Sequence, residues 1–202
     1  AATMTDETVT VAEISSFQLE TIHEFHPQIS AILNITPDHL NRHHTMDCYI
    51  KTKEAITTNQ TKDEVCVLNY EDEVLRAFGE SAPVHVVWFS SARKLAEGFY
   101  LDGEEIFYAH DGNTEKVINV NDLNLLGRHN YENVMAATAM SVNFGVPMEK
   151  IVEVLKRFQA VEHRIEYVTE KRGVRFYNDS KGTNPDAAIQ GIRAMNRPTL
   201  LI

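Results

Sequence analysis

The sequence predicts an α/β protein with a doubly wound, mostly parallel sheet that carries an antiparallel excursion and is followed by the start of a second α/β unit. Three observations support this fold class. Short apolar runs alternate with amphipathic helical segments over the first part of the chain. Two strand-like segments then flank the pair Asp102-Gly103, which is a hairpin signal. The alternation of strands and helices starts again near residue 160.

The first part of the chain contains four expected strands and three expected helices. The strands are the apolar runs at 9–14, 29–35, 65–68 and 84–89. The helices run from Ser15-Ser16 to about Phe25, from Thr45 to about Thr58, and over 72–78. Serine and threonine are expected at the starts of the first two helices because their hydroxyl groups accept hydrogen bonds from the first amides of a helix.

The second part begins with the hairpin at 99–109. After it we expect helices at 129–143 and 149–158, strands at 165–169 and 174–178, a helix from Asn184-Pro185 to about Met195, and a strand at 199–202. The last strand looks like a buried parallel one, which normally has helices on both faces. Because no helix follows it, the sequence predicts a fragment cut inside the second unit, with domains at 1–160 and 161–202.

Composition excludes several classes of function. The chain of 202 residues has 24% charged residues and a net charge of −10 without a basic cluster, which argues against a nucleic-acid partner. No apolar run is long enough for a membrane span and no signal peptide is visible, so we expect a cytoplasmic protein without a membrane partner. Two cysteines, Cys48 and Cys66, cannot form a disulfide framework, and both are expected to be buried, inert thiols.

Polar side chains follow three of the expected strands. Glu13 closes the first, Asp38-His39 follow the second, and Asp179-Ser180-Lys181 follow the strand at 174–178. Ligands of open parallel sheets bind beyond the carboxyl ends of the strands. Glu13 and His39 could therefore converge on one cation, although an imidazole suits Mg²⁺ or Mn²⁺ only in part. The alternative is a helix-capping glutamate and a surface histidine.

Other candidates have equally plain structural interpretations. Lys53 lies mid-helix, one turn after Tyr49, and the pattern alone suggests a solvated lysine. His43 and His44, close to His39, suggest a histidine cluster, but loop histidines on an acidic surface explain them as well.

Two further groups could contact a nucleotide. Asn130 and Asn133 share one helix face and could bind an adenine edge or simply cap the helix. Arg164 follows the expected domain junction and could reach a phosphate across a cleft or form an interdomain salt bridge. No G-x-x-x-x-G-K-[ST], G-x-G-x-x-G or G-x-S-x-G motif occurs, so a phosphate loop would have to lie outside these residues.

Taken in order, the polar segments resemble the motifs of the Mur ligases. These segments are Glu13-Ile-Ser-Ser-Phe-Gln-Leu-Glu20, Asn34-Ile-Thr-Pro-Asp-His-Leu40, Tyr49-x-x-x-Lys53, Gly127-Arg-His-Asn-x-x-Asn133, His163-Arg164 and Asn178-Asp-Ser-Lys-Gly-Thr-Asn184. The run that starts at Glu13 is similar to that of the members that add D-glutamate. The resemblance implies the later part of a central ATPase domain at 1–160 and the start of a Rossmann-like C-terminal domain at 161–202. Members of the family are about twice as long, which agrees with a fragment that is inactive alone.

The resemblance also implies roles for individual residues. Glu13, His39 and Lys53 match the positions that hold two Mg²⁺ ions, with Lys53 carbamylated by CO₂. Asn130, Asn133, Arg164 and Asp179 match positions that contact ATP. Lys181 and Thr183 match positions that face the acyl phosphate and the incoming amino acid, and Ser15 and His39 match positions near the muramoyl substrate. Lys53, His39, Lys181 and Arg164 are the implied catalytic residues. Gly182 stands where the family often has alanine, and this is a mild departure.

The implied reaction has two steps. A carboxylate of UDP-N-acetylmuramoyl-L-alanine attacks the γ-phosphate of ATP, and the amine of D-glutamate then displaces phosphate from the acyl phosphate. The family is usually monomeric. Three other hypotheses remain open at this point: a Mur-type or folylpolyglutamate-type ligase for another amino acid, a non-catalytic nucleotide-binding module, and a metal-dependent hydrolase based on Glu13 and His39.

Overall fold

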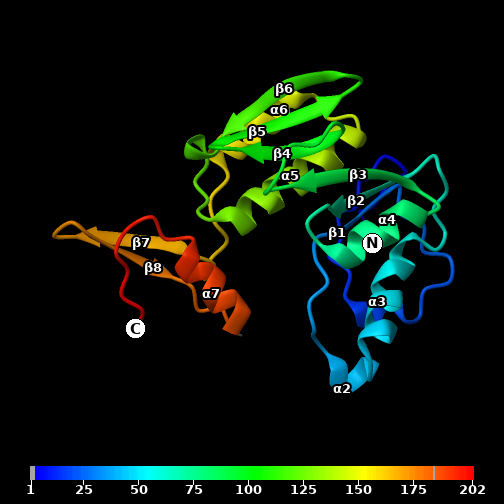
Figure 1. Ribbon diagram of the computed structural model, residues 1–202, viewed down its shortest axis with the longest axis horizontal. Helices are drawn as coiled ribbons and strands as arrows, with labels where there is room; N and C mark the ends of the chain where they lie inside the picture. The colour runs from blue at the N-terminus through cyan, green and yellow to red at the C-terminus, as the bar shows by residue number, and fades with distance from the viewer. Residues whose placement is uncertain (1–2, 184) are drawn as a thin grey trace.

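The computed structural model describes residues 3–183 and 185–202, apart from the side chain of Asp186. A six-stranded sheet has the order β1-β2-β3-β4-β5-β6, and a separate two-stranded sheet pairs β7 with β8 (Figure 1). The strands are β1 (Ile29–Ile32), β2 (Val65–Asn69), β3 (His85–Ser90), β4 (Gly98–Asp102), β5 (Glu105–His110), β6 (Asn113–Asn119), β7 (Glu166–Lys171) and β8 (Val174–Asn178). The helices are α1 (Ser16–Leu19), α2 (Leu40–His43), α3 (Met46–Glu54), α4 (Glu73–Ser81), α5 (Arg128–Asn143), α6 (Met148–Arg157) and α7 (Pro185–Arg193), with short 3₁₀ turns at η1 (Ala55–Thr57) and η2 (Val120–Asp122).

The pairing confirms a mostly parallel sheet with an antiparallel excursion. Strands β1 to β4 pair in parallel, whereas β4, β5 and β6 pair antiparallel. Parallel neighbours usually need a long crossover. β3 and β4 need only the loop at 91–97, because their pairing is limited to Phe89 with Phe99 and Ser90 with Tyr100.

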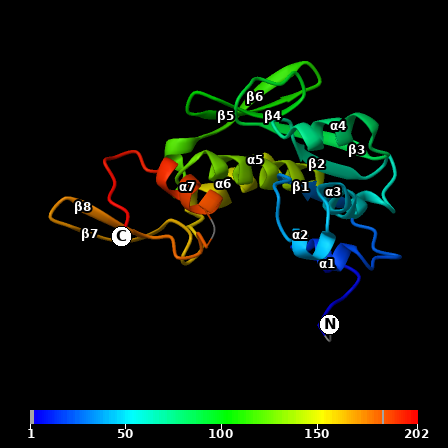
Figure 2. The ribbon, with the colours of Figure 1, turned by 60° about the horizontal axis from the view of Figure 1, so that its bottom comes forward.

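Both faces of the parallel strands are covered, which confirms the doubly wound arrangement. Val67 of β2 packs in a core with Met135 and other residues of α5. The neighbouring residue Leu68 points to the opposite face and packs with Leu75 of α4 and Tyr49 of α3. Successive side chains of a strand alternate between faces. The apolar run of β2 is therefore buried on both sides, with α5 and α6 side by side on one of them (Figure 2).

Capping side chains fix where the helices begin. Ser15 caps α1 in a reciprocal capping box with Gln18, and Thr45 caps α3. Asp72 caps α4 through Oδ1, and its Oδ2 accepts a hydrogen bond from the amide of Ile35 at 2.7 Å. The loop after β1 is therefore attached to the loop after β2.

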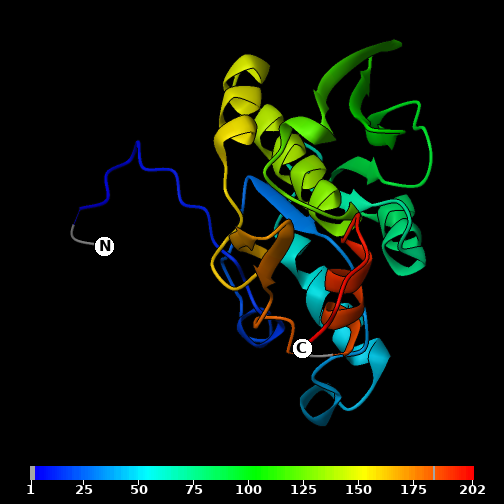
Figure 3. The same ribbon diagram turned by 90° about the vertical axis from the view of Figure 1, so that its left-hand side faces the viewer.

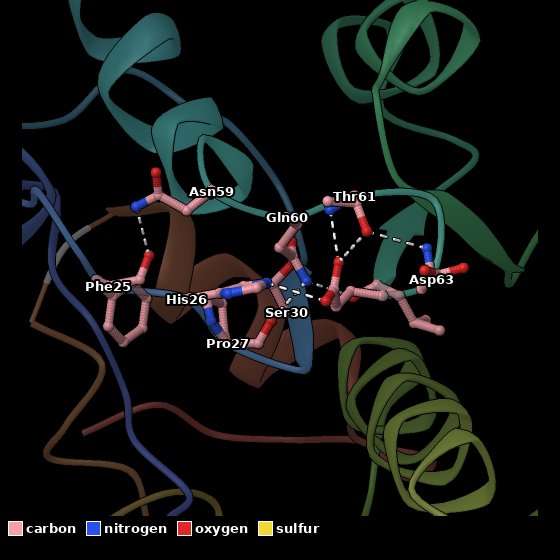
Figure 4. A network of polar contacts seen from close by, with 10 residues as sticks. Phe25, His26, Pro27, Ser30, Asn59, Gln60, Thr61 and Asp63 are labelled. Atoms are coloured by element: carbon pink, nitrogen blue, oxygen red, sulfur yellow. Dashed lines mark hydrogen bonds and ion pairs between the residues drawn. The ribbon is translucent and has the colours of Figure 1, made fainter.

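A polar network fastens the chain before β1 to the start of β2 (Figure 4). The buried hydroxyl of Ser30 donates to Gln60 Oε1 at 2.7 Å. The Gln60 amide donates to the carbonyls of Pro27 and Val65 at 3.0 and 3.2 Å. Asn59 donates to two further carbonyls of the segment before β1, at 2.9 Å each. These side chains therefore join backbone groups on both sides of the β1–β2 connection.

The prediction of strands at 9–14 and 199–202 is wrong. Residues 9–14 form no strand, Val11 is 89% exposed, and the segment extends away from the fold (Figure 3). Residues 199–202 also form no strand, and Leu200 and Ile202 are exposed. The physical reason is the same in both places: no strand among the described residues pairs with them, and an apolar run without a partner leaves its backbone groups unpaired.

Other expectations need smaller corrections. The helix expected to reach Phe25 ends at Leu19, because only Ser16 and Leu19 of it are buried and a short helix without packing does not propagate. Strand β6 was not expected, since its first half is polar and exposed. Cys48 is exposed on α3, so the expectation of a buried thiol is wrong there. Cys66 is buried, and burial raises the pKa of its thiol to about 11.

In the described part of the chain, none of the helices combines the length and the apolar composition needed to cross a bilayer.

We predict that Gln60→Ala lowers the free energy of unfolding by about 2–4 kcal/mol, because it leaves the Ser30 hydroxyl and two carbonyls without their partner. Urea unfolding followed by circular dichroism measures the change. Asn121→Ala is the matched control, since it removes an exposed amide contact to Glu104 and should cost less than about 0.5 kcal/mol. Equal effects of the two substitutions would contradict the structural role of the network.

Candidate functional site

Several of the sequence-predicted site residues surround the short helices α1 and α2. His39 precedes α2 and has a left-handed backbone with φ 52°. Its amide donates to Asp38 Oδ1 at 2.8 Å, and its ring Nε2 lies 3.4 Å from Asp38 Oδ2. The side chain is 48% exposed. His39 is therefore oriented by Asp38 and remains accessible to a ligand.

A series of ring contacts connects His39 to Lys53. The ring of Phe17 lies 4.9 Å from that of His39 and 5.7 Å from that of His43. The His43 ring lies 5.1 Å from Tyr49, and the Lys53 ammonium lies 5.3 Å from the centre of the Tyr49 ring. The structure thus brings His39 and Lys53 into one region, which we call the α1–α3 corner: Ser15–Glu20, Asp38–His43, Tyr49 and Lys53.

Charge and burial act together on Tyr49. Burial, followed by the negative charge of Asp38, raises the pKa of its phenol. The tyrosine therefore stays neutral beside the lysine, and Asp38 lies close enough to act on it. The loop after β1 and the middle of α3 consequently share one electrostatic environment.

His43 contradicts its expected position in a surface loop. It ends α2 and is buried, with Nε2 at 2.9 Å from Ser16 Oγ and Nδ1 at 3.4 Å from Glu20 Oε1. Arg42 pairs with Glu20 at 2.7 Å, and this hydrogen bond lowers the pKa of the Glu20 carboxyl. His44 is exposed. The sequence pattern around His39 could not separate the two neighbouring histidines.

Glu13 and Ser15 occupy the chain just before α1. Glu13 is exposed in an unpaired segment, so its expected place at the end of a strand is wrong. Ser15, not Glu13, caps the helix, and its hydroxyl is engaged with Gln18. Within the described residues, no three or more His, Cys, Asp and Glu side chains are arranged to hold a metal ion. His39 and Lys53 are connected through the rings of Phe17, His43 and Tyr49, so among the described residues the proposed metal set is not assembled into one site.

A second polar group at the carboxyl edge of the sheet was missed by the sequence analysis. Glu71, just after β2, accepts hydrogen bonds from Ser90 at 2.6 Å and from Arg93 at 2.7 and 2.8 Å. Burial alone would raise the pKa of Glu71, but these hydrogen bonds outweigh it and lower the pKa. Ser91 also donates to Glu132 of α5. Their positions after two strand ends were the available signal.

The two asparagines of α5 make different contacts. The Asn130 amide donates to the carbonyl of Leu126 at 2.7 Å, so it stabilises the start of the helix. Asn133 is exposed and lines an apolar groove of about 380 Å³ between α5 and α6. Binding of an adenine by either amide stays a prediction.

A third group of polar residues, which includes Asp179 and His129, lies where the β7–β8 unit meets the start of α5. Asp179 Oδ1 accepts a hydrogen bond from the amide of Ile165 at 3.1 Å. Burial lowers the pKa of His129, while the charges of Glu132 and Asp179 oppose that shift. Gly127 has φ 94°, and a Cβ there would come within 2.5 Å of the Ala194 Cβ. The residue that follows α7 therefore packs directly on the turn before α5.

Three candidate residues after the junction are exposed. They are Arg164, Lys181 and Thr183. The amide of Lys181 donates to the carbonyl of His163 at 2.9 Å, which fixes the backbone of this loop. Neither Arg164 nor Lys181 has a side-chain hydrogen bond or ion pair within residues 3–183 and 185–202, so the alternative of an interdomain salt bridge for Arg164 is not seen there. Asn184, the last residue of the resembling motif, lies outside the described residues.

Comparison with known proteins decides the family. A family model described as the Mur ligase middle domain matches residues 1–141. The chain belongs to the Mur ligase family. The roles of the individual site residues of this Mur ligase chain are predictions from its motifs.

Similar curated proteins agree with each other in name. The chain is 61% identical over 197 residues to UDP-N-acetylmuramoylalanine–D-glutamate ligase of Lachnospira eligens, covering 98% of the chain and 44% of that protein. It is 47% identical over 200 residues to the protein of the same name from Clostridioides difficile, covering 99% of the chain and 44% of that protein. This Mur ligase chain thus spans less than half the length of the relatives it matches.

Solved structures of Mur ligases share the fold. The chain aligns with MurC of Thermotoga maritima at a TM-score of 0.64 and 21% identity, covering 89% of the chain and 39% of that structure. MurF of Acinetobacter baumannii aligns at a TM-score of 0.62 and 21% identity, covering 81% of the chain and 36% of that structure. These likenesses confirm the α/β fold class.

We predict that His129→Asn makes stability less sensitive to acid. The folded-state pKa of His129 lies below the unfolded value of about 6.5, so the unfolded chain takes up a proton first as pH falls. Stability from this group is therefore present above that unfolded value and is lost on acidification toward the folded pKa. Thermal unfolding at pH 7.5 and 5.5 should show a smaller loss for the variant than for the wild type. His85→Asn, at an exposed site on β3, should behave like the wild type, and an unchanged loss in His129→Asn would contradict the prediction.

Proposed function

We propose that the complete gene product containing this chain is an ATP-dependent ligase that joins D-glutamate to UDP-N-acetylmuramoyl-L-alanine during peptidoglycan precursor synthesis. The observation that carries this proposal is the 61% identity over 98% of the chain with the Lachnospira eligens protein of that name. The activity belongs to the complete product, of which ATP would be a substrate. We expect the 202-residue chain alone to be inactive, since it contains no phosphate-loop motif.

The first proposed step activates the muramoyl substrate. Its terminal carboxylate oxygen attacks the γ-phosphorus of ATP, the bond to the β–γ bridging oxygen breaks, and ADP leaves. The product is an acyl phosphate. Ser15 and His39 are the proposed contacts of this substrate, and both lie in the α1–α3 corner. Holding the carboxylate in line with the phosphate supplies much of the rate, because placement removes entropy from the reaction.

The second proposed step forms the amide. The amine of D-glutamate attacks the acyl carbon, a tetrahedral intermediate forms, and inorganic phosphate leaves with the bond to carbon broken; the proton of the amine is released. Lys181 and Thr183 are the proposed groups at the acyl phosphate and the incoming amino acid. Arg164 and Lys181 are exposed cations without side-chain partners in the described part of the chain, which suits them to offset phosphoryl charge.

Nucleotide contacts in this proposal come from both sides of the junction. We propose that Asn130 and Asn133 of α5 contact the adenine and that Asp179 contacts the ribose. Asp179 and the start of α5 already share an electrostatic environment through His129. The groups of the two units would then bind one nucleotide together, and Arg164 and Lys181 would reach the site on domain closure, as in enzymes whose closure completes the catalytic site.

Magnesium and a carbamate on Lys53 are also proposed, with Glu13, His39 and Lys53 as the residues that would hold two Mg²⁺ ions. When bound, Mg²⁺ neutralises charge on the transferring phosphoryl group. His39 and Lys53 both belong to the α1–α3 corner, where the rings of Phe17, His43 and Tyr49 lie between them, and Glu13 is exposed in the segment before α1. Carbamylation would replace the ammonium of Lys53 with an anion, which is the charge that a hard cation requires.

The remaining features of the proposal concern the whole protein. We place the domain boundary near residue 160, between α6 and β7. We expect a monomer that works in the cytoplasm on small-molecule substrates.

We predict that the complete gene product releases phosphate from ATP only when UDP-N-acetylmuramoyl-L-alanine and D-glutamate are both present. A phosphate-release assay with each component withheld in turn measures this, with the 202-residue chain as the inactive control. Release without any amino acid would favour a hydrolase. Release with another amino acid but not D-glutamate would assign the protein to a different ligase, and no turnover would leave a binding module.

We predict that Arg164→Ala lowers kcat of the complete product by about 100-fold or more, because it removes a cation that offsets charge in the transition state. Its unfolding free energy should change by less than about 0.5 kcal/mol, since the exposed side chain has no partner in the described residues. Arg197→Ala, another exposed arginine beyond the junction, serves as control and should leave both quantities unchanged. Comparable losses of turnover and stability in the Arg164 variant would refute the role.

A further inference from the structure

A buried histidine joins the two short helices of the α1–α3 corner. His43, 2% exposed, lies with Nε2 at 2.9 Å from the hydroxyl of Ser16 on α1. Its Nδ1 lies 3.4 Å from Oε1 of Glu20, which follows α1. Serine, histidine and glutamate therefore stand in the same atomic order as in a hydrolase triad.

The burial of Ser16 excludes a nucleophilic role for this arrangement. Ser16 is only 4% exposed, and its hydroxyl is directed at His43 inside the fold. Glu20 is held from the other side by Arg42, with Nη2 at 2.7 Å from Oε2. A nucleophile must be within reach of its substrate. The arrangement therefore fixes structure and does not attack a substrate.

The carboxylate determines which nitrogen of His43 carries the proton. Nδ1 makes no hydrogen bond to any described residue, and the Glu20 carboxylate lies just beyond hydrogen-bond geometry on that side. A neighbouring carboxylate favours a proton on the nitrogen that faces it. Nε2 is then free to accept the hydrogen of the Ser16 hydroxyl, and both helices are attached to one rigid ring.

The contacts of Phe17 extend this attachment to the proposed substrate residues. Its ring is nearly parallel to that of His43, at 10° and 5.7 Å, and it also touches the ring of His39 at 4.9 Å. Helix α1 has four residues and cannot persist without tertiary contacts. His43 therefore sets the position of Ser15 at the start of α1 relative to His39 at the start of α2.

We propose that His43 is a positioning residue of the ligase site, and that with Ser16 and Glu20 it holds Ser15 and His39 in the register needed by the muramoyl substrate. This inference rests on the proposed function. None of the three residues touches the substrate in this proposal. They act by holding the N-terminal ends of α1 and α2, where Ser15 and His39 lie.

The kinetic test uses the complete gene product with His43→Ala, the milder Ser16→Ala, and His43→Gln, whose terminal amide can still accept from Ser16. Loss of such a supporting contact typically lowers affinity or activity by about 10- to 100-fold. We expect His43→Ala to raise KM for UDP-N-acetylmuramoyl-L-alanine by about 10-fold or more, with KM for ATP within about twofold of the wild type. His43→Gln should restore most of the affinity. His44→Asn, at the exposed neighbouring histidine, is the matched control and should behave like the wild type.

A second measurement separates this inference from the proposed function. Hydrogen exchange of the backbone amides of 16–20 should accelerate in His43→Ala and recover in His43→Gln, while the amides of β2 stay protected. An unchanged KM for the muramoyl substrate, an equal rise in KM for ATP, or unchanged exchange in α1 would overturn the inference. If the wild type shows no D-glutamate-dependent turnover, the proposed ligase fails, and the exchange result still decides whether His43 positions α1.

Discussion

The structure depends on covering both faces of the two central strands, β2 and β3. Val67 and Val87 are buried against α5, while Leu68 packs with α3 and α4 on the opposite face. A parallel sheet with an open face would expose apolar area that stabilises the fold at about 25 cal/mol per Å² when buried. Because β1, β2 and β3 pair in parallel, their carboxyl ends lie at one edge of the sheet, and the loops that follow them meet there.

The loops at that edge are tied to each other by polar side chains. Asp72 caps α4 and also accepts the amide of Ile35, so it joins the ends of β1 and β2. Glu71 joins the ends of β2 and β3 through Ser90 and Arg93. Asp38–His43 of the α1–α3 corner follow the first of these loops along the chain, whereas Ser15–Glu20 precede β1. The contact between His43 and Ser16 joins these two segments.

The parts of the fold that could be predicted from the sequence are those whose signals are local. The caps Ser15 and Thr45 and the hairpin at Asp102-Gly103 lie where the sequence indicated. Residues 9–14 and 199–202 have the same apolar pattern as true strands, but a strand also needs a neighbour, and no local signal reveals its absence. The exposure of Cys48 and the burial of His43 likewise depend on which helix packs nearby.

In the candidate site, too, local motifs were visible in the sequence, whereas contacts between distant residues were not. Motif positions indicated His39, Lys53, Arg164 and Lys181, yet the supporting contacts of His43 join residues 27 positions apart, from Ser16 to α2. Those contacts are part of a continuous series of rings in the α1–α3 corner, from His39 through Phe17 and His43 to Tyr49. Arg164 and Lys181 are exposed without partners in the described residues. In the proposed ligase one half of the site is therefore preformed, while the cations arrive from the other side of the junction. We expect a reaction that transfers a phosphoryl group to benefit from this arrangement, because closure of a site also displaces water from it.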